Sequence, residues 1–274
     1  MRRLEWVKPA AVLLVAAHPD DETVGFGITM GTLAHAGWQV RILHVTDGSP
    51  RNAELRASLA GYTREQAAQV RRDELRAAVR ASGFEDPDTI LLPSLGVVDQ
   101  EAAFAIVPIA RQVAQFIETQ RPAIVVTHPY EGGHPDHDAV AFAVHAAVRI
   151  VRGGGATAIG HAEMTSYHRA GDSVVTGRFR SDGANPPCGR GRTERLDAEG
   201  RERKIRMLEA FASQAGVLAQ FGAADEPLRC APAYDFDRPP HAGTLNYERW
   251  SFGWTGARVC ELMRAARVEL GLDT

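Results

Sequence analysis

The sequence predicts a doubly wound α/β protein with a mostly parallel sheet, and three observations support this. Short runs rich in Val, Leu and Ile alternate with longer segments of helical periodicity. The runs are apolar on both faces, which is typical of strands buried between two layers of helices. Polar residues follow directly after strand ends, where open parallel sheets bind their ligands.

The first half of the chain supplies four predicted strands, at residues 10–17, 40–45, 90–92 and 123–127. Helical periodicity predicts helices at 24–33, 63–83, 108–118 and 138–151. Thr63 and Gln66 form the capping-box pattern that begins the second helix. Residues 47–61 lack periodicity and are predicted as loop. We therefore expect a Rossmann-like sheet of order 3-2-1-4-5, with right-handed crossovers and helices on both faces.

The regular alternation of predicted strands and helices ends at the glycines at 153–155. Strand-like stretches are at 164–167 and 174–179, and a Gly-, Pro- and Arg-rich loop follows at 181–192. Two helices are predicted at 197–212 and 255–270. No long low-complexity linker separates the two parts. We expect one α/β domain over residues 1–274, with a core at 1–155 and a C-terminal elaboration at 156–274.

The composition favours a globular protein and argues against nucleic-acid binding and a membrane span. The 274 residues are 45% hydrophobic and 24% charged, enough for a substantial core. A formal net charge of -3 gives no basic field, so we expect no nucleic-acid partner. The 3 cysteines are odd in number and far apart, which favours a reducing compartment. The apolar run at 10–17 is shorter than the roughly 20 residues of a membrane span. Charged and proline residues before it argue against a signal peptide. We expect a cytoplasmic protein without an integral membrane segment, and a homo-oligomer stays open.

Two polar motifs follow the first and fourth predicted strands. Residues 18–22 read His-Pro-Asp-Asp-Glu, and residues 132–138 read Gly-Gly-His-Pro-Asp-His-Asp. Because these strands are neighbours in the expected order, the motifs would meet at one site. Imidazole nitrogens and carboxylate oxygens are ligands of catalytic zinc, which needs three of them. The surplus residues can supply a general base and a group that stabilises an oxyanion or protonates a leaving amine.

Simpler explanations exist for single residues of these motifs. Asp20, Asp21 or Asp136 could cap the helices that follow. The repetition of His-Pro-Asp at two strand ends favours a metal site instead. Three glycines in the first helix loosely follow a dinucleotide fingerprint, but two aspartates in the turn would repel a pyrophosphate.

With these motifs, the chain resembles the PIG-L or LmbE-like zinc-dependent N-deacetylases. That family includes deacetylases of N-acetylglucosaminyl lipids and of N-acetylglucosaminyl-inositol. The resemblance covers roughly the first 150 residues, with Thr-Asp-Gly at 46–48 and Arg-Arg-Asp-Glu at 71–74 as further matches. It implies that His18, Asp21 and His137 hold Zn²⁺, and Fe²⁺ suits the same ligands.

The resemblance also implies the catalytic roles. Asp20 would be the general base, and His134 would face the oxyanion and the leaving amine. Asp136 would support His134. The histidine at 128 directly follows the fourth strand and is a candidate for the outer part of the site.

Three residues are candidates for substrate binding. Arg71 would contact substrate hydroxyls or phosphate, as the resemblance implies. Asp47 could accept a sugar hydroxyl, although Asp-Gly after a strand is equally an ordinary turn. Some family members carry a tyrosine two residues before the catalytic histidine, where this chain has Gly132. Tyr130 could replace it.

The implied reaction is hydrolysis of the N-acetyl group of an N-acetylglucosamine-type sugar or glycoconjugate, which releases acetate and a free amine. One alternative is a zinc amidase that acts on a larger N-acyl or thiol conjugate. Another is a non-catalytic carbohydrate-binding protein with a retained zinc site. Aromatic residues between 234 and 254 either line the pocket or pack the last helix onto the sheet.

Overall fold

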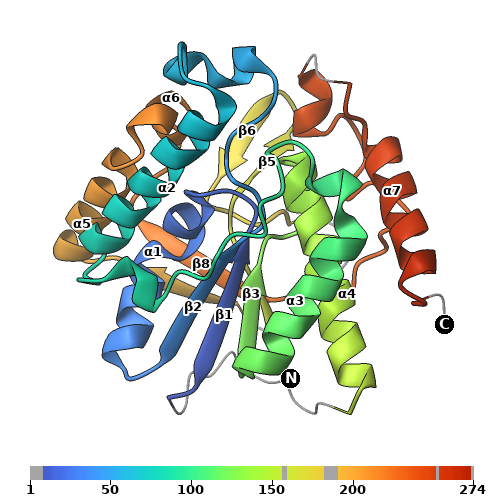
Figure 1. The fold of residues 1–274 in the computed structure, drawn as a ribbon, viewed down its shortest axis with the longest axis horizontal. Coiled ribbons are helices and arrows are strands. Elements are labelled where there is room, and N and C mark those ends of the chain that lie inside the picture. The colour runs from blue at the N-terminus through green and yellow to red at the C-terminus, as the bar shows by residue number, and fades with distance from the viewer. Residues whose placement is uncertain (1–8, 156–158, 182–190, 251–252, 273–274) are drawn as a thin grey trace.

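The fold is described from a computed structural model and covers residues 9–155, 159–181, 191–250 and 253–272 (Figure 1). A six-stranded sheet has the order β2-β1-β3-β4-β8-β7. The strands are β2 Gln39–His44, β1 Ala11–Ala16, β3 Ile124–Thr127, β4 Gly160–Met164, β8 Asp225–Cys230 and β7 Arg192–Arg195. The first four are parallel to one another. Strand β8 pairs antiparallel with β4, and β7 pairs antiparallel with β8 at the far edge. The fold is therefore mixed α/β with a mostly parallel sheet.

The predicted strand at 90–92 is wrong as a full strand. Leu91 and Val97 form only isolated parallel bridges, to Ile42 and Thr46 on the β2 side. Pro93 directly after this segment has no N–H to donate, which stops the ladder. The predicted stretch at 164–167 is split between the end of β4 and the start of β5 Tyr167–Ala170, which pairs with β6 Ser173–Thr176. The order β2-β1-β3-β4 places the expected strands 2, 1, 4 and 5 side by side in that sequence, and the unpredicted strands β8 and β7 extend the sheet beyond β4.

Helices cover both faces of the sheet (Figure 1). One face carries α1 Asp21–His35, α2 Arg64–Ala81 and α5 Ala198–Glu209, and the other carries α3 Ile106–Gln120, α4 Pro135–Gly153 and α7 Gly256–Glu269. The short helix α6 is Ala215–Leu218. The predicted capping box at Thr63 is present. The predicted loop at 47–61 contains a 3-10 helix, Ala53–Leu59. Most of the predicted loop at 181–192 lies outside the described residues.

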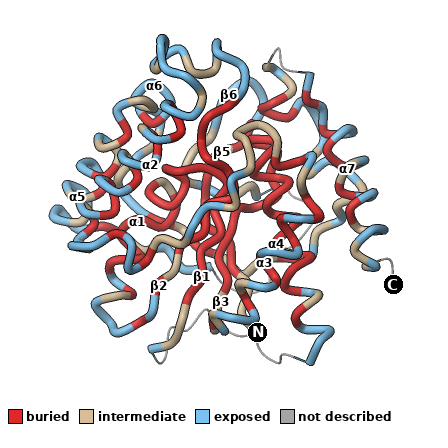
Figure 2. The backbone as a smooth tube through the Cα atoms, viewed as in Figure 1, coloured by how far each residue is buried: buried red, intermediate tan, exposed pale blue. Residues whose placement is uncertain are grey.

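Strand β1 is buried on both sides, which fixes the position of its carboxyl end. Leu14 and Ala16 pack toward α1, α2 and α5, whereas Leu13 and Val15 pack toward α3, α4 and α7. All four are fully buried, and Figure 2 shows the buried sheet between helices with exposed outer faces. Burial of each Leu or Val side chain contributes about 1.5–3 kcal/mol. The loop after β1 thus starts from a rigid base.

A buried ion pair ties the C-terminal part to α1. Glu226 of β8 accepts the backbone N–H groups of Ile28 and Thr29, at 2.9 and 2.8 Å, in the middle of that helix. Lys204 of α5 pairs with Glu226 and donates to the Val24 carbonyl at 2.9 Å. Both charged side chains are fully buried, so each depends on the other for compensation. This pair fixes where α1 sits against β8 and α5.

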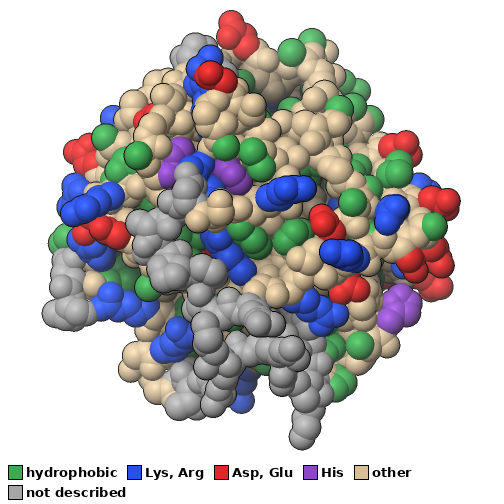
Figure 3. Space-filling model, turned by 180° about the vertical axis from the view of Figure 1, so that it is seen from behind, with side chains coloured by type: hydrophobic (Ala, Val, Ile, Leu, Met, Phe, Trp, Pro, Cys, Tyr) green, Lys and Arg blue, Asp and Glu red, His purple; other side chains and the backbone are tan. Residues whose placement is uncertain are grey.

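The surface carries charge of both signs. Figure 3 shows basic and acidic side chains interspersed over one face, with hydrophobic side chains in small groups between them. Within the described residues, no helix combines the length and apolar character of a membrane span.

Helix α1 also approaches β4 unusually closely. A Cβ atom at Gly25 would lie 2.6 Å from the Thr165 carbonyl oxygen and 2.8 Å from Met164 Cγ. A backbone oxygen at that distance cannot move aside without shifting the chain. Glycine at position 25 is therefore required by packing.

We expect Gly25→Ala to lower the free energy of unfolding by about 1–3 kcal/mol, because overpacking outweighs the better helix propensity of alanine. Equilibrium urea unfolding would measure this. Gly216→Ala in α6 is the matched control, since a Cβ there meets no atom within 4 Å. A Gly25→Ala variant as stable as the Gly216→Ala variant would contradict this packing.

Candidate metal centre

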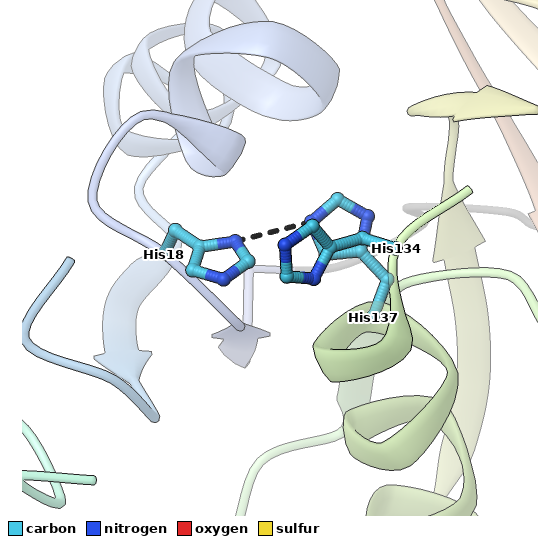
Figure 4. A group of neighbouring side chains, drawn as sticks. All are labelled: His18, His134 and His137. Carbon is cyan, nitrogen blue, oxygen red and sulfur yellow. Dashed lines mark hydrogen bonds between the residues drawn. The ribbon is translucent and has the colours of Figure 1, made fainter. Parts of the chain in front are cut away.

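Two loops at the carboxyl ends of β1 and β3 bring three ligand-type side chains together. His18 follows β1, Asp21 begins α1, and His137 lies in the first turn of α4. His18 Nδ1 lies 3.2 Å from His137 Nε2 and 3.3 Å from Asp21 Oδ2, and His137 Nε2 lies 3.2 Å from Asp21 Oδ1. All three side chains are buried. Figure 4 shows His18 pointing across the gap toward His134 and His137.

The remaining ring nitrogens have partners that assign the protons. His18 Nε2 lies 3.2 Å from both Asp99 Oδ1 and Asp136 Oδ2, so it carries hydrogen, and a neutral ring then offers its lone pair on Nδ1. Ser166 Oγ, 3.3 Å from His137 Nδ1, can accept that proton, which leaves Nε2 bare. When both rings are neutral, two lone pairs and the Asp21 carboxylate therefore face one another.

This donor set fits a divalent cation. Tetrahedral ligands about 2.1 Å from a zinc ion are spaced by about 3.4 Å, close to the distances between the three donors. Burial alone would raise the pKa of Asp21, but the neighbouring His137 and His128 hold it well below its usual range. The carboxylate is therefore charged, as a metal ligand must be.

Asp20, the neighbour of Asp21, points to a different partner. Its backbone φ of 134° is rare for a residue with a side chain. Glu22 Oε2 stabilises the turn by accepting the Asp20 N–H at 2.9 Å. Arg71 Nη2 donates to Asp20 Oδ2 at 2.8 Å and to the Pro19 carbonyl. Burial raises the pKa of Asp20 to about 6, against the effect of Arg71, so the group is ionised at neutral pH.

The helix-cap interpretation of the aspartates is wrong. Asp20 is the N-cap residue of α1, but its side chain makes no capping hydrogen bond. Helix α4 is capped by His134, whose Nδ1 accepts the Asp136 N–H at 3.0 Å. Pro135 occupies the first helical position, where its missing N–H costs nothing, so α4 begins before the predicted residue 138.

The predicted support of His134 by the Asp136 side chain is also wrong. That carboxylate accepts the backbone N–H groups of Gln100 and Ala102, at 2.7 and 3.0 Å, and contacts His18. Asp136 points to these groups because α4 turns its side chain toward the loop before α3. It orients the predicted ligand His18.

Gln100 contacts His134 instead. Because His134 Nδ1 accepts a backbone N–H, its neutral ring carries hydrogen on Nε2, which lies 2.7 Å from Gln100 Nε2. Both groups would donate, and Gln100 Oε1 is buried without a partner. Rotation of the Gln100 side-chain amide makes Oε1 the acceptor of the hydrogen on His134 Nε2. Burial lowers the pKa of His134 well below its usual value, in agreement with a neutral ring.

The structure places only one of the three predicted substrate-binding residues at the cavity. Arg71 lines it beside Asp20. Asp47 instead accepts the Ser49 N–H at 3.0 Å and pairs with Arg64, so it closes a turn. Tyr130 is wrong as a replacement tyrosine: its hydroxyl donates to the Arg238 carbonyl at 2.8 Å, within the core formed by α4 and α7.

Sequence reasoning missed Asp99, Gln100 and Tyr167. Asp99 and Gln100 follow Val97, which bridges to the end of β2, so the rule used for the other strand ends could have found them. Tyr167 lies in the β5–β6 hairpin, 5.5 Å from the His137 ring, and no pattern marks it. His128 stacks on His137 at 4.1 Å, and its Nε2 accepts the Ala17 N–H at 2.9 Å.

The predicted ligands His18, Asp21 and His137 line a cavity of about 430 Å³, together with Asp20. Asp99, Gln100 and His134 contribute polar groups to it. An apolar wall comes from Val217, Leu218 and Phe221. A larger cavity, of about 950 Å³, lies between α4 and the end of β8, and none of the predicted site residues lines it.

The chain is similar to several known proteins. Residues 13–148 match the family model of PIG-L, GlcNAc-PI de-N-acetylase. A 1D-myo-inositol 2-acetamido-2-deoxy-alpha-D-glucopyranoside deacetylase of Kineococcus radiotolerans is 32% identical over 178 residues, which are 57% of this chain and 49% of that protein. The chain spans about half the length of the curated relatives it matches.

Solved structures show the same fold at low sequence identity. The A40926 pseudoaglycone deacetylase matches with a TM-score of 0.57 and 19% identity, over 80% of this chain and 96% of that one. The N,N'-diacetylchitobiose deacetylase of Pyrococcus horikoshii matches with a TM-score of 0.55 and 18% identity, over 81% and 84%. Both histidine- and aspartate-containing motifs fall inside the matched family region, and the chain thus carries a PIG-L family domain over residues 13–148.

Proposed function

We propose that this protein is a zinc-dependent N-deacetylase of an N-acetylglucosamine-type amino sugar or glycoconjugate. The observation that carries the proposal is the buried cluster of metal-ligand atoms on His18, Asp21 and His137, with Asp20 and His134 beside it. The deacetylase names of the relatives support the substrate class.

His18, Asp21 and His137 would hold the zinc ion, and Fe²⁺ is the alternative occupant of the same ligands. When bound, the ion polarises the amide carbonyl and lowers the pKa of water from about 15.7 toward 7. Asp99 and Asp136 hold the His18 ring in the orientation that presents Nδ1.

Asp20 accepts the proton of the attacking water while the water oxygen bonds to the acetyl carbonyl carbon. Arg71 keeps the Asp20 carboxylate in place. His134 presents its Nε2 hydrogen at the cavity wall, where it can reach the oxyanion while Gln100 fixes the orientation of the ring. The carbon–nitrogen bond then breaks, and the amine takes the proton held by Asp20. The products are acetate and a free amine.

A zinc amidase for larger N-acyl conjugates is the second candidate, because of the apolar wall. Val217 is 51% exposed, so the cavity opens toward solvent along this wall. A longer acyl chain could lie there. A non-catalytic carbohydrate-binding protein would need neither Asp20 nor His134 next to the ligand set.

Amine release from N-acetylglucosamine glycosides and N-acyl variants tests the proposal, with zinc-loaded and chelator-treated protein in parallel. We expect release that the chelator abolishes, greatest for the acetyl substrates. Preference for long acyl groups would support the amidase. Absence of release from every substrate by zinc-loaded protein would overturn the amino-sugar assignment.

Asp20→Asn removes the base and leaves the ligand set intact. We expect the turnover rate to fall by about 10² to 10⁴ with zinc content unchanged, measured by amine release and elemental analysis. Asp73→Asn, an exposed acid on α2, is the control. Near-native turnover of the Asp20 variant would exclude this role.

His137→Ala should lose bound zinc and therefore activity. Elemental analysis after dialysis would show clearly substoichiometric metal, while the exposed control His35→Ala keeps the metal content of the parent protein. Full occupancy in the His137 variant would contradict the ligand assignment.

Gln100→Ala should release His134 from its fixed orientation. We expect kcat to fall by roughly three- to tenfold, the worth of one neutral hydrogen bond, with KM and zinc content little changed. Gln100→Glu retains an acceptor and should restore part of the loss. An unchanged kcat in the alanine variant would show that Gln100 does not position His134.

A further inference from the structure

A second hollow adjoins the catalytic cavity, and we propose that it binds the ring joined to the amino sugar, on Phe104, with Arg258 selecting a negatively charged group on that ring. This inference rests on the proposed function, because it names the class of glycoside that the same site accepts.

The hollow and the catalytic cavity are adjacent. The hollow has a volume of about 560 Å³ and shares four lining residues with the catalytic cavity: Pro50, Leu55, Asp99 and Gln100. Gln100 contacts His134, which faces the oxyanion in the proposed reaction. The apolar wall at Val217 contributes nothing to the hollow. The hollow therefore extends the site away from the wall that would receive the acyl group, which leaves it for the substituent of the sugar.

An aromatic surface faces this hollow. Phe104 is 58% exposed, and its ring lies 5.0 Å from that of Trp254, at an interplanar angle of 38°. Trp254 is only 7% exposed, because it is packed into the core with α4 and α7. Trp254 thus supports the Phe104 ring, which stays more than half exposed. A sugar or aromatic ring can stack on such a surface.

The charges around the hollow leave one cation available. Arg51 pairs with Glu101 at 2.6 Å, so these two charges compensate each other. The Asp99 carboxylate also lines the hollow, and it is held by His18 Nε2 at 3.2 Å. Arg258 lies over Phe104, 5.7 Å from the ring centroid, and its guanidinium has no ion pair among the described residues. A carboxylate or phosphate on the stacked ring would supply the missing anion.

Three substrates separate these contributions: N-acetylglucosamine, its phenyl glycoside and its 4-carboxyphenyl glycoside. We expect the wild-type kcat/KM to rise in that order. Phe104→Ala should lower kcat/KM for both aryl glycosides by three- to tenfold and leave the free sugar unchanged. Arg258→Gln should lower it only for the 4-carboxyphenyl glycoside, by a factor that shrinks as salt increases. A 4-phosphophenyl glycoside shows whether phosphate is preferred to carboxylate.

Tyr62→Ala is the matched control, since Tyr62 is 51% exposed but does not line the hollow. Equal effects of Phe104→Ala on all three substrates, or no effect on any, would overturn the subsite while the deacetylase assignment stands.

Calorimetric binding of the deacetylated 4-carboxyphenyl glucosaminide to chelator-treated protein is the readout that needs no turnover. Binding weakened by both substitutions would support the subsite even if zinc-loaded protein hydrolysed none of the substrates, in which case the deacetylase assignment alone would fail. Binding indifferent to both substitutions would count against the subsite directly.

Discussion

The arrangement of the site depends on one electrostatic constraint, the burial of three acceptors that face one another. His18 Nδ1, His137 Nε2 and the Asp21 carboxylate lie within 3.3 Å of each other in the interior of the protein. With both rings neutral, their lone pairs repel the carboxylate and each other, so the proposed cation between them would stabilise this geometry. The surrounding contacts follow from this, since Asp99 and Asp136 fix the His18 ring and Ser166 fixes that of His137.

Adjacent residues can have different tasks here because the backbone directs them apart. The unusual φ of Asp20 turns its carboxylate to Arg71 on α2, while Asp21 faces the histidines. Such a conformation costs about 1–3 kcal/mol and needs support. Glu22 supplies it locally, and the Lys204–Glu226 pair holds α1 from the C-terminal part of the chain.

The family region and the rest of the chain contribute different parts of the site. Residues 13–148 contain the ligand set, the proposed base and Gln100. The apolar wall at Val217 and the Trp254 that supports Phe104 lie beyond it. A site built this way can keep one hydrolytic chemistry while the C-terminal part changes the acyl group and the ring that fit.

The sequence alone determined the alternating α/β elements and the meeting of two motifs at adjacent strand ends, because both follow from local periodicity and the direction of parallel strands. Only the tertiary structure decided which groups touch. It assigned Asp136 to His18, turned Tyr130 into the core and brought Gln100 to His134. Long-range contacts of this kind depend on how a helix is rotated against its neighbours, which spacing along the chain does not encode. Strands β8 and β7 were not predictable either, since their polar, partly exposed residues gain strand structure only when β8 pairs with β4 and β7 pairs with β8.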